Sequence, residues 1–149
     1  MTSSVHFSSA TDQWPTPQAF FDQWAGRFTF TLDVCADASN AKCARFFDRE
    51  ANGLAMDWAV NVCWMNPPYG REIGRWVAKA YRESLKGSTV VCLLPARTDT
   101  AWWHDYVLPF AEVTFVRGRI KFGEAKAGAP FPSAVAVFHP RLAPPEAAR

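Results

Sequence analysis

The fold is decided by residues 60–95, which read VNVCWMNPPYGREIGRWVAKAYRESLKGSTVVCLLP. Val60 to Met65 is an apolar run, and the two prolines shortly after it stop both a helix and a sheet ladder. From Ile73 to Leu85 the apolar residues recur with the period of an amphipathic helix, which Gly87 ends. Thr89 to Leu94 is a continuous apolar run, typical of a fully buried parallel strand. This order of strand, helix and strand predicts an α/β fold.

Segments on either side of this stretch extend the alternation of helices and strands. Gln18 to Ala25 favours a short helix, and apolar residues alternate with polar ones from Phe28 to Val34, which predicts a strand. The other expected elements are a short strand over Ala44 to Asp48, a helix capped by Thr98 or Asp99 that carries Trp102, Trp103, Tyr106 and Val107, and strands over Glu112 to Arg117 and Ser133 to Phe138. The pattern is typical of a Rossmann-like sheet, whose ligands bind at the carboxyl ends of its strands.

Length and composition indicate one folded unit. The chain has 149 residues, of which 49% are hydrophobic, and a formal net charge of +2. We expect a flexible arm over residues 1–11, one domain over 12–139 and a flexible tail over 140–149, because the ends are rich in Ser and Thr or in Pro and Ala. No apolar run approaches the roughly 18 residues that cross a bilayer, and the start lacks the features of a secretory signal. The sequence predicts a cytoplasmic protein with no membrane partner.

The four cysteines favour a packing role. Cys35, Cys43, Cys63 and Cys92 form no C-x-x-C pair and have no histidine doublet near them. Three of the four lie in apolar runs, so we interpret the cysteines as reduced core thiols rather than metal ligands or disulfide partners. We expect no metal site.

The tetrapeptide Asn66-Pro67-Pro68-Tyr69 carries the strongest chemical signal. An exocyclic amino group of a nucleobase is a poor nucleophile because its lone pair is delocalised into the ring, and two acceptors aimed at its hydrogens hold it in a reactive geometry. The side-chain oxygen of Asn66 and the carbonyl of Pro67 are suited to this role, since the Pro-Pro step has no N–H to compete. Tyr69 offers a flat face for stacking of an extruded base. Alone, the same four residues are also typical of a turn that ends a strand.

Motifs along most of the chain carry a resemblance to a known family. They are Asp12-Gln13-Trp14-Pro15-Thr16-Pro17, Leu32-Asp33-Val34-Cys35-Ala36, Gly53-Leu54 followed by Asp57-Trp58, Trp64 through Arg71, Leu94-Pro95-Ala96-Arg97-Thr98-Asp99, and Gly118 through Phe122. In these, the sequence resembles the phage and prophage DNA N6-adenine methyltransferase (Dam) family over about Ser8 to Phe138. The resemblance implies a Rossmann-like S-adenosylmethionine-dependent methyltransferase sheet, reduced in size and with helices on both faces. It also implies methyl transfer from S-adenosylmethionine to the N6 amino group of adenine in double-stranded DNA.

The resemblance further implies which residues contact S-adenosylmethionine. They are Trp14, Thr16 and Pro17 at its methionine end, Asp33, Cys35 and Ala36 at the tip of the first strand, and Asp57 with Trp58 at its adenine. Asp33 is suited to accept a hydrogen bond from the cofactor's ammonium. Cys35 to Asp37 stand where many such enzymes have a Gly-rich loop, so the ribose contact is open, with Asp48 and Glu50 as weak candidates. Core packing explains Trp14 and Trp58 equally well.

Basic residues near the end of the chain suggest a DNA contact. Arg117, Arg119 and Lys121 alternate with apolar residues, which suits phosphate contact beside a packed sheet and, equally, a solvated strand edge. Arg71 and Arg97 are interpreted as extensions of this DNA-binding patch. Either Phe122 or Phe131 is expected to form a second wall around the extruded base.

Several functional alternatives stay open. The chain leaves no room for a separate recognition domain, so we expect a homodimer, or readout by the loop over Gly123 to Pro132, to complete DNA recognition. A cytosine-N4, RNA or protein-glutamine methyltransferase would use the same acceptor pair, which serves any planar amine or amide. A catalytically silent homologue that binds DNA or the cofactor is a further alternative. Methylation of carbon 5 of cytosine is disfavoured, because no Pro-Cys pair supplies its nucleophile.

Overall fold

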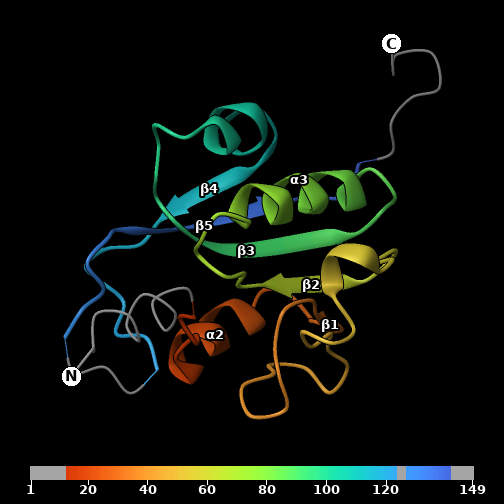
Figure 1. Cartoon of the computed structure of the whole chain (residues 1–149), viewed down its shortest axis with the longest axis horizontal. Coiled ribbons are helices and arrows are strands. Elements are labelled where there is room, and N and C mark those ends of the chain that lie inside the picture. Colours follow the sequence, from red (N-terminus) through yellow and green to blue (C-terminus); the bar gives the residue numbers. More distant parts are fainter. Residues whose placement is uncertain (1–12, 124–126, 142–149) are drawn as a thin grey trace.

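The continuous apolar run forms the central strand of a five-stranded sheet with the order β1-β2-β3-β5-β4 (Figure 1). The computed structural model describes residues 13–123 and 127–141, so the arm expected over 1–11 and most of the tail expected over 140–149 lie outside the described residues. The strands are β1 (Leu32–Asp33), β2 (Val62–Met65), β3 (Thr89–Pro95), β4 (Glu112–Phe115) and β5 (Ser133–Phe138). β1, β2 and β3 run parallel, and β5 pairs antiparallel with both β3 and β4. The carboxyl ends of β1 and β2 therefore lie at the same edge.

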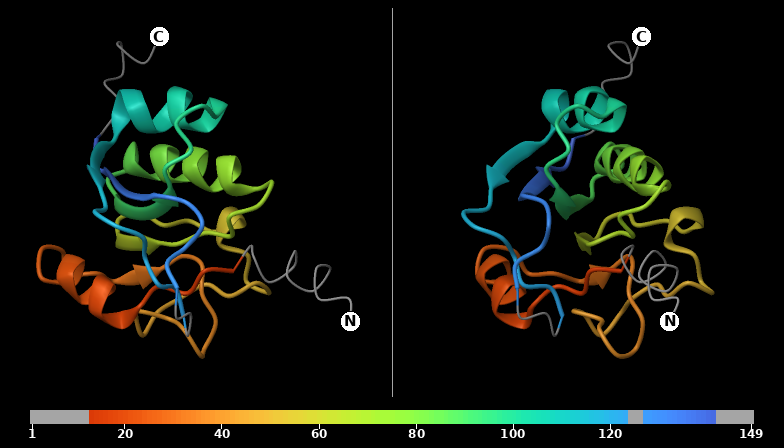
Figure 2. Two further views of the ribbon diagram at one scale, coloured as in Figure 1. Left: turned by 90° about the vertical axis from the view of Figure 1, so that its left-hand side faces the viewer. Right: turned by 60° about the vertical axis from the view of Figure 1, so that its left-hand side comes forward.

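Helices cover both faces of this sheet. They are α2 (Gln18–Ala25), the short turn η1 (Gly53–Ala55), α3 (Ile73–Ser84), the π-helical turn η2 (Trp103–Val107) and α4 (Leu108–Phe110). The right-hand view of Figure 2 shows α2 and α3 on opposite sides of the sheet. Phe21 of α2 packs edge-on against Trp64 of β2, with ring centroids 5.1 Å apart, and η2 packs beside α3. Among residues 13–123 and 127–141, no helix is long and apolar enough to cross a membrane.

The first strand is shorter than the alternation over Phe28 to Val34 predicted. Its ladder covers only β1. Phe30 packs its ring edge-on against Trp64, with 5.6 Å between centroids, and Phe28 packs against Phe30 at 5.9 Å. Leu32 and Val34 are thus buried, whereas Phe28 and Phe30 are partly buried and form an aromatic cluster beside α2 in place of a regular strand.

Two further strands are shorter than predicted. In the segment Ala44 to Asp48 only Phe46 forms a bridge, to Asp33 of β1, before the chain turns. β4 ends before Arg117, because Gly118 adopts a φ of 76° and changes the chain direction there. The sheet is accordingly smaller at both edges than the sequence pattern indicates.

The helix after β3 begins with a different cap from the one expected. Thr100, and neither Thr98 nor Asp99, accepts the N–H of Trp103 on its Oγ1 at 3.3 Å. The Thr100 hydroxyl also lies 2.7 Å from the carbonyl of Arg97, to which it donates. The prediction of a helix that carries the tryptophans is confirmed, with a π-helical turn at its centre.

A buried carboxylate of α3, that of Glu83, holds the segment before β2 against this helix. The side chain of Glu83 is 2% exposed and accepts the N–H of Trp58 at 2.8 Å. Its other oxygen pairs with Lys79 at 3.1 Å and with Lys86 at 2.9 Å. A carboxylate removed from water needs such partners, and this one anchors Trp58 in the core.

Candidate active site

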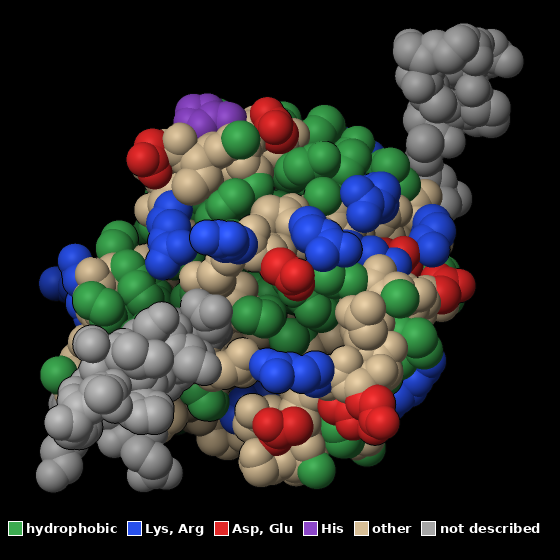
Figure 3. Space-filling model, viewed as in Figure 1, with side chains coloured by type: hydrophobic (Ala, Val, Ile, Leu, Met, Phe, Trp, Pro, Cys, Tyr) green, Lys and Arg blue, Asp and Glu red, His purple; other side chains and the backbone are tan. Residues whose placement is uncertain are grey.

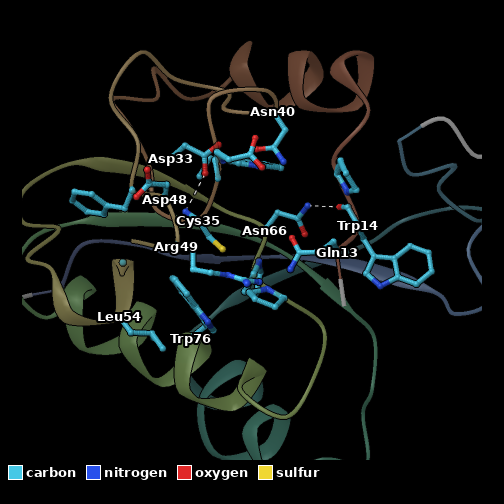
Figure 4. A pocket seen from close by; sticks show the side chains of 18 of the residues that line it. Gln13, Trp14, Asp33, Cys35, Asn40, Asp48, Arg49, Leu54, Asn66 and Trp76 are labelled. Atoms are coloured by element: carbon cyan, nitrogen blue, oxygen red, sulfur yellow. Dashed lines mark hydrogen bonds between the residues drawn. The ribbon is translucent and has the colours of Figure 1, made fainter. Parts of the chain in front are cut away.

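A cavity of about 1000 Å³ opens at the carboxyl ends of β1 and β2 (Figure 4). Its walls come from the segment before α2, the loop between β1 and η1, the motif after β2, and Trp76 of α3. The residues expected from the sequence that line it are Trp14, Thr16, Asp33, Cys35, Ala36, Asp48, Asn66, Pro67, Pro68 and Arg71. Ligand pockets commonly measure about 300–1000 Å³, so this one is large enough for a nucleotide-sized cofactor.

The side-chain amide of Asn66 has a fixed orientation at the end of β2. Its Nδ2 donates to the carbonyl of Trp14 at 2.5 Å and to Oγ1 of Thr16 at 3.0 Å. A carbonyl can only accept, so the amino side of the amide must face Trp14. Its Oδ1 is buried and has no hydrogen-bond partner among the described residues. The motif therefore presents one unused acceptor in a desolvated place.

An unused buried acceptor is the feature that an amine substrate needs. A buried polar atom without a partner costs free energy, and such atoms in folded proteins call for an explanation such as a bound ligand. The group that satisfies Oδ1 of Asn66 must donate a hydrogen. Pro67 and Pro68, which line the cavity beside it, have no N–H with which to do so. The arrangement suits an exocyclic amino group and would repel a carbonyl.

Tyr69 is not the open stacking face that the sequence predicted. Its side chain is 4% exposed, and its hydroxyl donates to the carbonyl of Leu93 at 2.9 Å. Burial raises the pKa of this hydroxyl well above its usual value, so it stays a donor. Its ring lies 6.5 Å from that of Trp14, nearly parallel to it, and 5.6 Å from that of Phe131. In this conformation the Tyr69 ring is enclosed by other aromatic side chains and is not open to a base.

Phe122 and Phe131, either of which was expected to form a second wall around the base, both pack against Tyr69. Phe122 lies 6.2 Å from Tyr69 and 5.5 Å from Trp14, both edge-on. The segment that carries Phe122 is fastened to the chain before α2, since the N–H of Gly123 donates to the carbonyl of Pro15 at 2.9 Å. Residues far apart in the sequence thus form one aromatic cluster next to the motif.

Asp33 holds the loop after β1 against the cavity. Its carboxylate is 2% exposed and accepts the backbone N–H groups of Cys35 at 3.2 Å and Lys42 at 2.9 Å. Burial raises the pKa of Asp33 to about 6, although both hydrogen bonds and the charge of Lys42 act to lower it. A cation bound in the cavity would stabilise the ionised form.

The thiol of Cys35 is unsuited to nucleophilic attack. Burial, together with the charge of Asp33, raises the pKa of Cys35 to about 12, so it is a neutral thiol at physiological pH. Cys35, Cys43, Cys63 and Cys92 are all free. The chemistry of the cavity therefore rests on hydrogen bonding and shape rather than on a thiolate.

Trp76 is the clearest site residue that sequence reasoning missed. Its indole lines the cavity, and its Nε1 is buried with no partner among the described residues. The periodicity of α3 placed Trp76 on the apolar face, where nothing distinguishes a core tryptophan from one at the rim of a cavity. Asn40, Lys42 and Arg49 also line the cavity without having been expected. They lie in the loop after β1, whose path depends on Asp33.

Asp57 and Trp58 do not reach the cavity, so their predicted contact with a cofactor adenine is not supported by the structure. Asp57 lies at the surface, where its carboxylate accepts the N–H of Ala59 at 3.0 Å and pairs with Lys86 at 3.1 Å. Trp58 is fully buried and donates from Nε1 to the carbonyl of Gly53 at 2.9 Å. Its ring stacks on that of Trp76, with 6.3 Å between centroids. Trp58 thus supports the cavity wall from behind.

Pro17 and Glu50 also lie outside the cavity lining. Pro17 is the N-cap of α2, and its carbonyl accepts the N–H groups of Phe20 and Phe21, both at 3.1 Å. Glu50 lies at the surface, whereas Asp48, the other weak candidate for the ribose, lines the cavity. The Asp48 carboxylate already accepts the N–H of Ala51 at 2.8 Å, which leaves its second oxygen for a ligand.

The basic residues proposed for DNA contact surround the aromatic cluster only in part. The guanidinium of Arg97 lies 6.0 Å from the centre of the Phe131 ring, and Arg119 donates to the carbonyl of Ala129 at 3.2 Å. Lys121 is exposed in the same segment, and Arg71 lies at the cavity rim. Arg117 instead lines a separate shallow groove beside α2. Figure 3 shows Lys and Arg side chains in a band, with acidic ones between them, across one face of the molecule.

The chain is similar to known proteins, and a family model matches nearly its whole length. Residues 3–138 match the family model described as DNA N-6-adenine-methyltransferase (Dam). The chain is 36% identical over 126 residues to the DNA N-6-adenine-methyltransferase of Haemophilus phage HP1. The aligned region is 82% of this chain and 72% of that relative. It is 33% identical over 107 residues to the DNA N-6-adenine-methyltransferase of Escherichia phage T1. That aligned region is 70% of this chain and 44% of the relative. The chain spans less than half of the length of that second protein.

The matched residues include every strand and helix that the structure describes and all the walls of the cavity. The unused acceptor of Asn66 therefore lies within the region that matches the family model. The chain belongs to the family of DNA N-6-adenine-methyltransferases (Dam).

Proposed function

We propose that this cavity binds S-adenosylmethionine together with an extruded adenine of double-stranded DNA, and that the protein transfers a methyl group to N6 of that base. The observation that carries the proposal is the buried, unused Oδ1 of Asn66, whose amide is held with its acceptor free. The family shows the reaction, DNA adenine N6 methylation. The residue roles that follow are our interpretation of the geometry.

The residues of the cavity fit S-adenosylmethionine in their hydrogen-bonding character. Asp33 would accept from the ammonium of its methionine part, and the buried indole N–H of Trp76 would donate to an acceptor of its adenosine part. Asp48 has an oxygen left for the ribose. When bound, this cofactor supplies a methyl group on a sulfonium, which is a good leaving group.

The protein contributes alignment and desolvation to such a transfer. Asn66 would accept one hydrogen of the target amine and hold its nitrogen in line with the methyl group, with the Pro67 carbonyl as the second acceptor. Removing the amine from water strengthens these hydrogen bonds. No side chain has to take the proton during attack, because the amine loses it after methylation. The neutral thiol of Cys35 is therefore not needed as a base.

The sheet fits this assignment as a reduced Rossmann-like sheet. Two adjacent parallel strands, β1 and β2, end at the cavity, and the carboxyl ends of strands are where ligands bind in open α/β sheets. We propose that Arg97, Arg119 and Lys121 contact DNA phosphates beside the aromatic cluster. The cytoplasm of a bacterium or of a phage-infected cell is the proposed location, because it holds both the DNA and the cofactor. The expectation of a homodimer stays a prediction.

Methyl transfer to DNA tests the proposal directly. Purified protein is incubated with labelled S-adenosylmethionine and unmethylated duplex DNA, and the product is digested to nucleosides and identified by mass. We expect N6-methyladenine. N4-methylcytosine would keep the acceptor mechanism and change the base, and label only in RNA or protein would contradict DNA as the substrate. Absence of label with measurable cofactor binding would favour a catalytically silent homologue.

Asp33 gives cofactor binding an expected pH dependence. Because its pKa in the free protein is about 6, binding of an ammonium must ionise the carboxyl below that pH. The affinity for S-adenosylmethionine, measured by calorimetric titration, should therefore weaken by up to about tenfold per pH unit below 6 and be constant above 7. In Asp33→Asn this dependence should disappear and the affinity should be low throughout. The surface variant Asp22→Asn should behave as the wild type, and an unchanged pH profile in Asp33→Asn would contradict the contact.

The same group should make the free protein less stable as the pH rises. The pKa of Asp33 is higher in the folded state, about 6, than its ordinary value of 3.8, so the folded state binds the proton more tightly. The Asp33 contribution to the free energy of unfolding is therefore present below pH 4 and is lost as the pH rises to about 6, by roughly 1–3 kcal/mol. Denaturant unfolding of wild type and Asp33→Asn across this range isolates that contribution.

A further inference from the structure

The amide of Asn66 is oriented by residues that lie about fifty positions earlier in the chain. Its two N–H bonds are both used, one by the carbonyl of Trp14 at 2.5 Å and one by Oγ1 of Thr16 at 3.0 Å. Thr16 is 6% exposed, so its hydroxyl lies away from solvent. The dashed line between Asn66 and Trp14 in Figure 4 marks the first of these contacts, with the amide oxygen turned away from it.

The segment that supplies these two acceptors is itself held in place. The carbonyl of Pro15, between them, accepts the N–H of Gly123 at 2.9 Å. Immediately after them, Pro17 caps α2. The ring of Trp14 packs edge-on against Phe131 at 5.1 Å. Pro15 and Pro17 fix φ at two of the four positions from Trp14 to Pro17, so the two acceptors have little freedom to follow the amide if it turns.

We propose that Thr16 is a positioning residue of the methyl transfer: with the carbonyl of Trp14 it locks the Asn66 amide so that Oδ1, and not Nδ2, faces the target amine. This inference rests on the proposed function, since it assigns to Asn66 the role of acceptor. It differs from the role that the family resemblance implies for Thr16, which is contact with the methionine end of the cofactor.

The lock decides which kind of group the site accepts. The two ends of an amide are nearly equal in size, and only hydrogen bonding distinguishes them. If the amide turned over, Nδ2 would point at the amine, and donor would face donor. In that orientation the Asn66 amide would instead suit a carbonyl, such as that of thymine. When both hydrogen bonds hold the Asn66 amide, its Oδ1 pairs with an amino group and repels a carbonyl.

Thr16→Val tests the lock, because valine keeps the shape of the side chain and removes the hydroxyl. One N–H of Asn66 then has no acceptor and the amide can swing about χ2. We expect kcat for DNA methylation to fall roughly ten- to a hundredfold, since misplacement of a reacting group by about 1 Å can have effects of this size. The KM for DNA and the affinity for S-adenosylmethionine should stay unchanged, because a residue that acts only on alignment affects kcat.

Two matched variants separate positioning from general damage. Thr16→Ser keeps the hydroxyl and should restore kcat to within about threefold of wild type. Thr31→Val removes a hydroxyl that makes a similar pair of contacts, to the N–H of Val62 and to Oδ1 of Asn61, both at 3.0 Å, at the opposite end of the sheet. It should leave kcat unchanged even if it lowers Tm.

The outcomes distinguish this inference from the proposed function. A wild-type kcat in Thr16→Val, in a protein whose Asn66→Ala variant is inactive, would overturn the lock and leave the proposed function standing. Weaker S-adenosylmethionine binding in Thr16→Val with unchanged kcat would overturn it as well and would make Thr16 a cofactor contact. Loss of kcat that Thr16→Ser does not restore would also contradict it. A wild type that methylates no DNA would instead overturn the proposed function.

Discussion

Asn66→Ala is expected to lower kcat for DNA methylation roughly a hundred- to a thousandfold, the size of effect found when one preorganised hydrogen-bonding group is removed from an active site. Oδ1 of Asn66 is a buried acceptor without a partner among the described residues, and alanine removes it entirely. The variant also releases the carbonyl of Trp14 and the hydroxyl of Thr16. Formation of N6-methyladenine at saturating cofactor and DNA measures the effect.

A matched control for this variant lies at the other end of the same strand. Asn61 precedes β2 and donates from Nδ2 to the carbonyl of Trp58 at 3.0 Å, far from the cavity edge. Asn61→Ala should keep the wild-type kcat, although its stability is expected to fall. If Asn66→Ala retained more than about a tenth of the activity, its amide could not be the group that holds the target amine.

Trp58→Ala is expected to lower the free energy of unfolding by about 3–5 kcal/mol, as is usual for truncation of a large buried aromatic side chain. Trp58 is fully buried, donates to the carbonyl of Gly53 and stacks on Trp76. Denaturant unfolding measures the loss. The size of the effect follows from lost packing and from the carbonyl of Gly53, which would remain buried without its donor.

Trp58→Phe distinguishes this structural role from the cofactor contact that the family resemblance implies. Phenylalanine keeps most of the packing and removes only the N–H, so we expect a loss of about 1–3 kcal/mol in the free energy of unfolding. The affinity of the folded protein for S-adenosylmethionine should equal that of the wild type. Clearly weaker binding in Trp58→Phe, with a small change in stability, would show that Trp58 does contact the cofactor.

The buried strand β3 and the amphipathic helix α3 were predicted correctly. β3 and α3 follow the continuous apolar run and the helical period closely, because burial there depends on neighbours along the chain. The segment Phe28 to Val34 shows the limit of this reasoning. Its alternation predicted a long strand, but Phe30 packs against Trp64 and Phe28 packs against Phe30 without a regular ladder.

For the site, the sequence identified the motif and left the walls of the cavity undecided. Asn66 and Asp33 were expected at the strand ends, and they meet there because parallel strands end at one edge. Trp58 and Trp76 are both tryptophans in apolar surroundings, and the sequence favoured Trp58. The structure places Trp76 at the cavity and Trp58 behind it, since Glu83 fixes the backbone of Trp58 in the core.

The sequence by itself determined the strand, turn and helix around the tetrapeptide, and with them the chemistry that this motif can perform. These features are local, because periodicity and proline stereochemistry act over a few residues. Only the tertiary structure decided that the chain before α2 orients Asn66 and that Tyr69 is enclosed by Trp14 and Phe131. Such contacts join residues fifty or more positions apart. They are set by how the whole chain packs, which no pattern along a short stretch of sequence records.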